Sequence, residues 1–264
     1  MKAMLSRFLG STRAKTPHIV HRDMPRLKDA TLSVAYFAPR AGGDFHGSVR
    51  VGPTRFLFGL LDVAGKRATS GPILEAAQAC FRAAAEDIFC GEELNESEAM
   101  IELARRLNLE IMRAAGGVRS CPAFLGCYNE EVGTVCYVNA GHTPGLLRDH
   151  ASVVELPATG LPFGLFSLAP TDARIVGLGP EGSIAVVSRG VVEAECKHSH
   201  PIPRKPRGMG TPSEFGLAGV KDVMQAGPAS ARELSQRILE EVQAFMHTAP
   251  KHNDVTVLTL IRSC

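Results

Sequence analysis

The most regular apolar pattern in the chain covers residues 55–61. Phe56, Phe58 and Leu60 alternate there with Leu57, Gly59 and Leu61. Apolar residues at both alternating positions predict a strand that is buried on both faces and that ends at Asp62. Residues 31–37 alternate in a similar way, and they predict an earlier strand that runs into a turn at Gly42 and Gly43.

Three segments have the spacing of amphipathic helices. The first covers about residues 72–89, with Pro72 in the first turn, where proline is tolerated. The second covers residues 96–115, and Asn95 with Glu98 gives it a capping-box-like start. The third follows a cap at Ser230 and carries the last apolar stripe of the chain.

Further strands are predicted at 123–128 and 134–139, joined as a hairpin, and at 146–147, 183–188 and 255–261. The first 28 residues are basic and irregular, which fits either a solvated segment or a docking arm for an acidic partner or an anionic membrane surface. We therefore predict a basic lead-in over residues 1–30. One domain of antiparallel strands and paired helices is predicted over residues 31–264.

Composition narrows the class of protein. The chain has 264 residues, 45% of them hydrophobic, and a net charge of +2, which indicates a globular protein and makes no case for nucleic acid. No apolar run approaches the roughly 20 residues of a membrane span, and the apolar core near the N-terminus is too short for a secretory signal. The seven cysteines contain no C-x-x-C pair, which favours reduced thiols in a cytoplasmic protein over a disulfide or zinc framework.

Asp44 and Asp62 carry the candidate chemistry. Both lie within the glycine-containing stretch 42–65, each at the end of an apolar segment. A carboxylate is costly to bury unless a cation or hydrogen-bond donors meet it. We therefore expect the two aspartates to face each other across a metal site.

Seven motifs follow one another along residues 31–262. They are GGDF at 42–45, DVAGK at 62–66, NAGHTP at 139–144, GLPFGL at 160–165, SRGVVEA at 188–194, FGL at 215–217 and NDVT at 253–256. In this order the chain resembles the PPM-type (protein phosphatase 2C-like) serine/threonine phosphatases, and among them the bacterial SpoIIE-like branch. Each motif alone is weak, whereas seven in one order are specific.

The resemblance implies an α+β fold in which two antiparallel β-sheets are sandwiched between helix pairs. It also implies a two-metal site, usually of Mn²⁺ or Mg²⁺, whose ions activate a bridging water and neutralise the phosphate. Hard ions of this kind take oxygen ligands. The implied substrates are phosphoserine or phosphothreonine proteins, often antagonists of anti-sigma factors, and a homodimer is left open.

Carried over by residue, the resemblance gives Asp44 and Asp62 catalytic and metal-binding roles and makes the backbone carbonyl of Val63 a further ligand. Two expected aspartates are replaced in this chain. Arg189 stands where the motif has Asp before Gly, and Asn253 opens the last motif. Both replacements remove a negative charge from the implied metal site.

Charge decides how much metal such a site holds. Asp44 and Asp62 against Arg189 leave a sum of about −1, which suits one weakly bound ion rather than two. Asn253 offers only a neutral carbonyl oxygen. Asp254 is expected to join the metal ligands only after a local shift, because neighbouring strand residues point to opposite faces.

Arg189 also suggests a phosphate-binding site, since a guanidinium matches phosphate in a bidentate way. Arg67 adds positive charge nearby. Two hypotheses stay open, namely a metal-dependent phosphatase with an altered site and a pseudophosphatase that binds a phosphoprotein. A further reading of Arg189 is a salt bridge to Asp62 or Asp44 that closes the site.

Three smaller features also have two readings each. His142 lies in the NAGH turn, where it bonds the turn backbone or acts as a general acid. His198 and His200 suggest a metal-binding pair, but they lie on a proline-rich loop without the further ligands of a zinc site. The basic loop 198–210 is either solvated or in contact with an acidic or phosphorylated partner.

Overall fold

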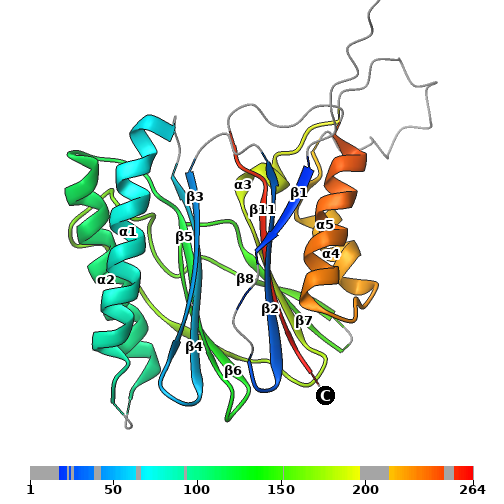
Figure 1. Cartoon of the computed structure of the whole chain (residues 1–264), viewed down its shortest axis with the longest axis horizontal. Coiled ribbons are helices and arrows are strands. Elements are labelled where there is room, and N and C mark those ends of the chain that lie inside the picture. The colour runs from blue at the N-terminus through cyan, green and yellow to red at the C-terminus, as the bar shows by residue number, and fades with distance from the viewer. Residues whose placement is uncertain are drawn as a thin grey trace, which may run out of the picture.

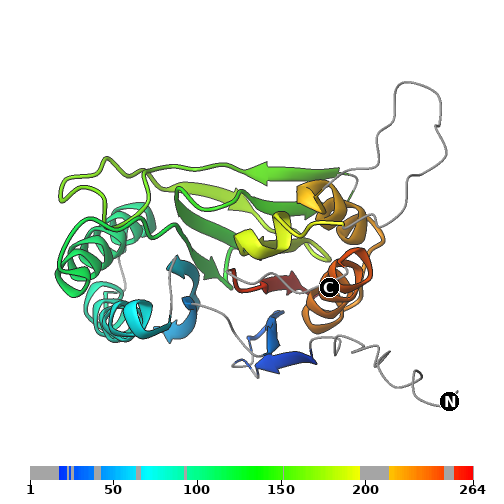
Figure 2. The same ribbon diagram turned by 90° about the horizontal axis from the view of Figure 1, so that it is seen from above.

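The fold is a layered arrangement of two sheets between two pairs of helices. A computed structural model describes residues 18–22, 24, 27–38, 43–63, 67–91, 94–150, 152–196, 214–246 and 253–263. The two sheets face each other, and helices lie on the outer face of each, as both views show (Figures 1 and 2). This is the predicted sandwich of two antiparallel sheets between helix pairs.

The first sheet has six strands in the order β1-β2-β11-β10-β7-β8. They are β1 (His18–Arg22), β2 (Ala30–Ala38), β11 (Thr256–Arg262), β10 (Ser183–Val187), β7 (Gly145–Asp149) and β8 (Ser152–Leu156). The last strand of the chain thus lies between β2 and β10, and all its pairings are antiparallel. This arrangement brings the segment that follows β10 and the segment that precedes β11 to the same end of the sheet.

The second sheet has five strands in the order β3-β4-β5-β6-β9. They are β3 (Gly43–Val51), β4 (Arg55–Val63), β5 (Ala123–Asn129), β6 (Thr134–Ala140) and β9 (Arg174–Gly177). In the β3–β4 hairpin, Asp44 lies directly opposite Asp62. The two aspartates that the sequence singles out are therefore cross-strand neighbours.

Five helices complete the described fold. They are α1 (Arg67–Ile88), α2 (Glu96–Ala115), α3 (Arg189–Val192), α4 (Gly216–Gln225) and α5 (Ala231–Phe245). The side chain of Asn95 caps α2 by accepting from the amides of Ser97 and Glu98, and Ser230 caps α5 in the same way. Gly116 ends α2 in the left-handed conformation that favours glycine.

Three hydrophobic clusters hold the layers together. One lies between the sheets and includes Phe56, Phe58 and Leu60 of β4. The second includes Leu57 and Leu61 of the same strand and packs under α1 and α2. The third lies between the six-stranded sheet and the helices α4 and α5. The two-faced apolar pattern of β4 thus results from its central place between two cores.

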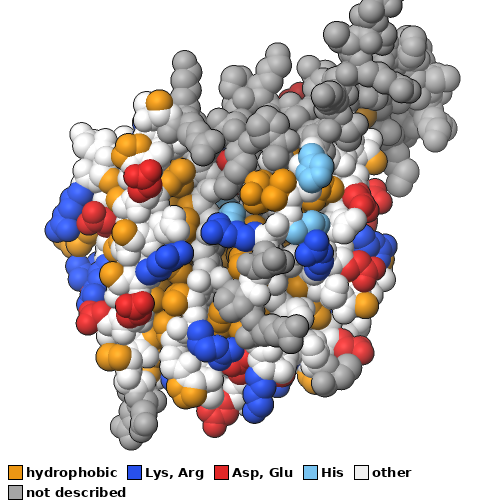
Figure 3. All heavy atoms as spheres, viewed as in Figure 1, with side chains coloured by type: hydrophobic (Ala, Val, Ile, Leu, Met, Phe, Trp, Pro, Cys, Tyr) orange, Lys and Arg blue, Asp and Glu red, His pale blue; other side chains and the backbone are white. Residues whose placement is uncertain are grey.

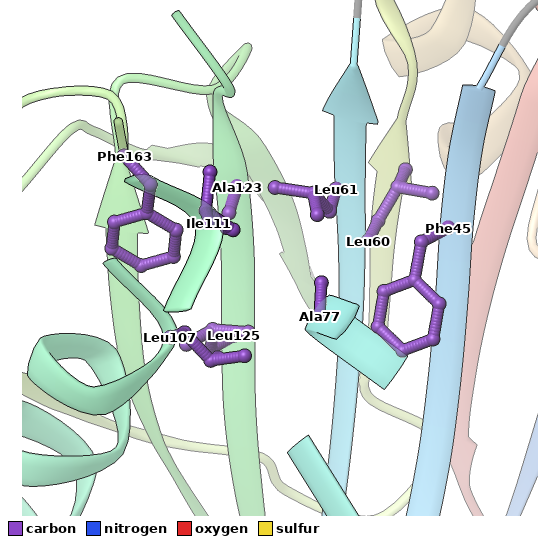
Figure 4. A pocket seen from close by; sticks show the side chains of 9 residues that line it. All are labelled: Phe45, Leu60, Leu61, Ala77, Leu107, Ile111, Ala123, Leu125 and Phe163. Carbon is purple, nitrogen blue, oxygen red and sulfur yellow. The ribbon is translucent and has the colours of Figure 1, made fainter. Parts of the chain in front are cut away.

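A small apolar cavity remains in the second cluster (Figure 4). Its volume is about 10 Å³, which is roughly one water-sized sphere. Side chains from β3, β4, β5, α1 and α2 line it, together with Phe163. It offers no polar atom to a ligand, so we interpret it as a packing gap.

Several predicted elements are confirmed and others differ. The bounds of α2, the β5–β6 hairpin and the strands β2, β4, β10 and β11 agree with the predictions to within about two residues. The first helix instead begins at Arg67, so that Pro72 lies inside it rather than in its first turn. This position removes only one main-chain hydrogen bond near the helix start.

The strands β1, β3, β8 and β9 and the helices α3 and α4 were not predicted. β1 lies within the segment that was expected to be irregular, and it pairs with β2 along all five of its residues. β3 was missed because glycine and polar residues interrupt its apolar alternation. Pairing with a strongly apolar neighbour compensates for this weak local pattern.

Candidate functional site

Asp44 and Asp62 lie at the end of the sandwich where β3 begins and β4 ends. Their residues are only 5% and 9% exposed. The structure therefore brings together the two residues that the sequence predicts for a metal site, at buried positions. Burial raises the pKa of Asp62, the Arg189 guanidinium opposes this rise, and Asp254 adds to it.

Asp254 also belongs to this site. Its Oδ2 accepts a hydrogen bond from the backbone amide of Asp44 at 3.2 Å. Asp254 precedes β11, so strand alternation does not set the direction of its side chain. That it joins the metal ligands only after a local shift stays a prediction. Ser188 fixes the backbone here, since its Oγ donates to the Asp254 carbonyl at 2.8 Å and accepts from the amide of Thr256 at 2.9 Å.

Arg189 begins α3, and its side chain reaches the Asp62 carboxylate. Its Nη2 lies 3.3 Å from Oδ2 of Asp62, and its Nε lies 4.0 Å from Oε1 of Glu193. The Arg189 side chain is 41% exposed, whereas that of Asp62 is 13% exposed. The predicted salt bridge between Arg189 and Asp62 is therefore present, and part of the guanidinium still reaches solvent.

Asn253 and Glu193 form a second polar contact beside Arg189. The Nδ2 of Asn253 donates to Oε2 of Glu193 at 2.8 Å. Glu193 lies within the SRGVVEA motif at 188–194, but the motif assigned it no role. Its spacing of four residues from Arg189 is the signal that could have found it, because residues four apart share one face of a helix.

Other predicted site residues are placed only in part. Val63 is buried as the last residue of β4, and its carbonyl stays a predicted ligand. Arg67 is the first residue of α1, but its side chain lies outside the described residues. The histidine pair His198 and His200 and the rest of loop 198–210 also lie outside them.

His142 is buried in the turn after β6. Its Nδ1 lies 3.1 Å from the carbonyl oxygen of Thr143, which agrees with the predicted role of bonding the turn backbone. Burial lowers the pKa of His142 to about 4, the bond to Thr143 opposes this, and Arg189 lowers the pKa further. The side chain is therefore a neutral imidazole at neutral pH.

The donors present allow a test of the implied two-metal centre. Asp62 is paired with Arg189, Asp254 accepts from the amide of Asp44, and the amide nitrogen of Asn253 is directed to Glu193. Within the described ranges, no three Asp, Glu, His or Cys side chains are placed to hold one ion together. A guanidinium cannot ligate a cation. The described residues therefore do not present a ligand set for two metal ions.

The local charge also differs from the expected sum of about −1, which counted only two acidic side chains. Among the described side chains, Asp62 and Glu193 contact the Arg189 guanidinium, and Asp44 and Asp254 lie beside Asp62, so these four carboxylates exceed the charge of Arg189 by three when all are ionised. A net negative site attracts cations and repels a phosphate. The contribution of Asp254 and Glu193 could not be counted before their positions were known.

Comparison with known families gives this site its context. The sequence profile of the family described as Stage II sporulation protein E (SpoIIE) matches residues 52–263, which is most of the chain. The chain belongs to the SpoIIE family. The resemblance drawn from the seven motifs is thereby confirmed, and the sandwich around the site is the PPM phosphatase fold.

Solved structures share this fold at low sequence identity. The RsbU and RsbW domains of Rv1364c from Mycobacterium tuberculosis match with a TM-score of 0.69 and 20% identity, over 89% of this chain and 60% of that structure. The SiaA-PP2C domain of Pseudomonas aeruginosa matches with a TM-score of 0.66 and 15% identity, over 88% and 86%. RsbX in complex with magnesium matches with a TM-score of 0.62 and 12% identity, over 93% and 100%. No curated protein sequence matches the chain.

Two surface properties bear on partners of this SpoIIE-family domain. On the face drawn in Figure 3, basic and acidic side chains are interspersed with apolar ones rather than gathered by sign. None of the helices in the described part of the chain combines the length and the apolar character that a membrane crossing needs.

Proposed function

We propose that this SpoIIE-family domain is a pseudophosphatase that binds a phosphorylated protein without hydrolysing it. The observation that carries the proposal is the contact of 3.3 Å between Arg189 and Asp62. It places a permanent positive charge against a carboxylate to which the family resemblance assigns metal binding. A guanidinium can neutralise and bind anions, but it cannot ligate and activate a water as a divalent ion does.

The exposed part of Arg189 supports phosphate binding. Nη2 and Nε face Asp62 and Glu193, whereas Nη1 takes part in neither contact and the side chain is 41% exposed. Arg67 remains a predicted second phosphate contact. Because the surrounding carboxylates repel a phosphate, we expect removal of the Asp62 charge to strengthen phosphopeptide binding.

The partner is proposed by class only. Similarity to a structure that holds RsbU and RsbW domains supports a protein partner, and the family resemblance makes an antagonist of an anti-sigma factor the leading candidate. The six cysteines within the described ranges are all free, which supports a reducing, cytoplasmic location. A homodimer remains a prediction.

A second candidate function is weak hydrolysis with one Mn²⁺ or Mg²⁺ ion. The specific observation in its favour is that Asp44, Asp62 and Asp254 are all buried at this end of the sandwich, with Asp254 only 7% exposed and hydrogen-bonded to the backbone amide of Asp44. After a local rearrangement, these three carboxylates would hold the ion, with neutral oxygens from Val63 and Asn253. Arg189 would first have to leave Asp62, which makes the ion compete with an internal cation.

Assays of turnover and binding separate the two functions. The purified protein is incubated with Mn²⁺ or Mg²⁺ and with phosphoserine peptides or an aryl phosphate, and phosphate release is measured. We expect no release above background, phosphopeptide binding that is lost in Arg189→Ala and strengthened in Asp62→Asn, and no binding of the unphosphorylated peptide. Metal-dependent release that disappears in Asp62→Ala would refute the pseudophosphatase proposal and support the second candidate.

A further inference from the structure

Two polar contacts connect the sheets at the end where the candidate site lies. Asp44 and Asp62 belong to the five-stranded sheet. Their partners are Asp254, which precedes β11, and Arg189, which follows β10, and both of those strands belong to the six-stranded sheet. Each contact therefore spans the gap between the sheets.

We infer that Arg189 acts as a tethered cation that holds this end of the sandwich closed without a divalent metal. The inference concerns the stability of the fold and stands whether or not a phosphoprotein binds. It follows from the geometry of the Arg189–Asp62 ion pair and of Glu193 and Asn253, which flank it.

The buried carboxylates at this end of the sandwich need a cation. The Asp62 side chain is only 13% exposed, and Asp254 and Asp44 lie close to it. Like charges at such distances repel one another strongly when water is largely excluded. A divalent ion can neutralise them from solution, but an arginine that is part of the chain is always present and always charged.

Arg189 and Asn253, the two departures from the family motifs, are connected through Glu193. Glu193 lies beside Nε of Arg189 and is held from its other side by the amide of Asn253. An aspartate at position 253 would place a second carboxylate against Glu193 instead of a donor. Asn253 and Arg189 thus support the same arrangement, in which Glu193 helps to orient the guanidinium toward Asp62.

Thermal unfolding with and without metal tests this inference. For the unmodified protein we expect the same Tm in EDTA and in 1 mM Mn²⁺, to within about 1 °C, since an ion that does not bind the folded state cannot stabilise it. Arg189→Ala should lower the Tm by about 5 °C, because it leaves a buried carboxylate without its cation. Asn253→Asp should lower it as well, by about 2 °C or more, through repulsion from Glu193.

A matched control is available on α5. The Arg237 side chain is 42% exposed and lies 3.7 Å from Glu233, so it resembles Arg189 in exposure but pairs with an exposed carboxylate. Arg237→Ala should change the Tm by no more than about 2 °C. A loss in Arg189→Ala that equals this control loss would overturn the inference.

The double variant Arg189→Asp, Asn253→Asp gives the reverse test. It should have a lower Tm than the unmodified protein in EDTA, and Mn²⁺ should raise that Tm by several degrees, because the carboxylates then lack an internal cation. A Tm of the unmodified protein that rises by 3 °C or more with Mn²⁺ would contradict the inference.

Arg189→Lys is the fallback variant if Arg189→Ala does not fold, because lysine keeps the positive charge. In EDTA, Arg189→Lys should have a Tm above that of the double variant. A Tm below that of the double variant would contradict the inference. Phosphopeptide binding is not measured here, so failure of this test leaves the proposed function to its own assay.

Discussion

Protonation of His142 should destabilise the fold in mildly acidic solution. The residue is only 5% exposed, and its Nδ1 lies 3.1 Å from the carbonyl oxygen and 3.0 Å from Oγ1 of Thr143. That hydroxyl donates to the carbonyl of Val187 at 2.5 Å, so both atoms near Nδ1 act as acceptors. The proton of the neutral ring therefore sits on Nδ1, and Nε2 has no hydrogen-bond partner among the described residues.

The size of the effect follows from the two pKa values. The pKa of His142 falls from the ordinary value of 6.5 to about 4 in the folded protein. A depressed histidine pKa means that the unfolded chain takes up the proton first, so stability is complete above pH 6.5 and is lost as the pH falls toward 4. At pH 5 the loss is about 2 kcal/mol, and it approaches about 3 kcal/mol below pH 4.

Urea unfolding at pH 7.5 and at pH 5 measures this loss. The variant His142→Asn keeps an amide donor near Thr143 but cannot take up a proton, so its stability should fall by about 2 kcal/mol less between the two pH values than that of the unmodified protein. His150→Asn is the control, because the His150 side chain is 69% exposed. The raised pKa of Asp62 acts in the opposite direction in every variant, which is why the comparison between variants is decisive. Equal pH dependence in His142→Asn and the unmodified protein would refute the reasoning.

Two further substitutions test the packing around the site and the helices. Glu96→Ala should lower the free energy of unfolding, measured in urea, by about 3 kcal/mol. The reason is that Arg55, whose side chain is 16% exposed, loses its carboxylate partner at 2.8 Å. A loss below about 1 kcal/mol would mean that this ion pair behaves as an exposed one. Gly190→Ala should lower the Tm by about 5 °C, because the added Cβ would lie 2.3 Å from the Asp254 carbonyl oxygen. Gly177→Ala is the control and should have little effect, because a Cβ added there has no heavy atom within 4 Å outside its chain neighbours. Equal Tm values for the two glycine variants would contradict this account.

The sequence predicts those parts of the fold whose local pattern and tertiary environment agree. The strand at 55–61 is apolar on both alternating faces because one face enters the core between the sheets and the other packs under α1 and α2. The second helix is bounded by Asn95 and Gly116, whose capping roles depend on nearby backbone atoms only. Local signals of this kind need no knowledge of the rest of the chain.

The candidate site could be predicted only in part, because its contacts join distant segments. Asp44 and Asp62 were found from the strand pattern and the motifs, and the register of one hairpin brings them together. The hydrogen bond from the Asp44 amide to Asp254 was not predicted, because Asp254 precedes β11 and strand alternation does not apply to it. Glu193 lies within the SRGVVEA motif but was given no role, because its importance comes from contacts with Arg189 and Asn253.

Under the proposed function, Arg189 in place of the expected aspartate explains which roles of a metal ion this site keeps and which it lacks. A metal ion in a phosphatase site neutralises the carboxylates, attracts the phosphate and activates a water. Arg189 can do the first, as its contact with Asp62 shows, and its exposed part suits the second. It cannot do the third, because a guanidinium has no vacant position for a water oxygen and keeps its proton at any relevant pH. Under the proposed function, an arginine in this place separates phosphate recognition from hydrolysis, and the phosphopeptide and turnover assays test that separation.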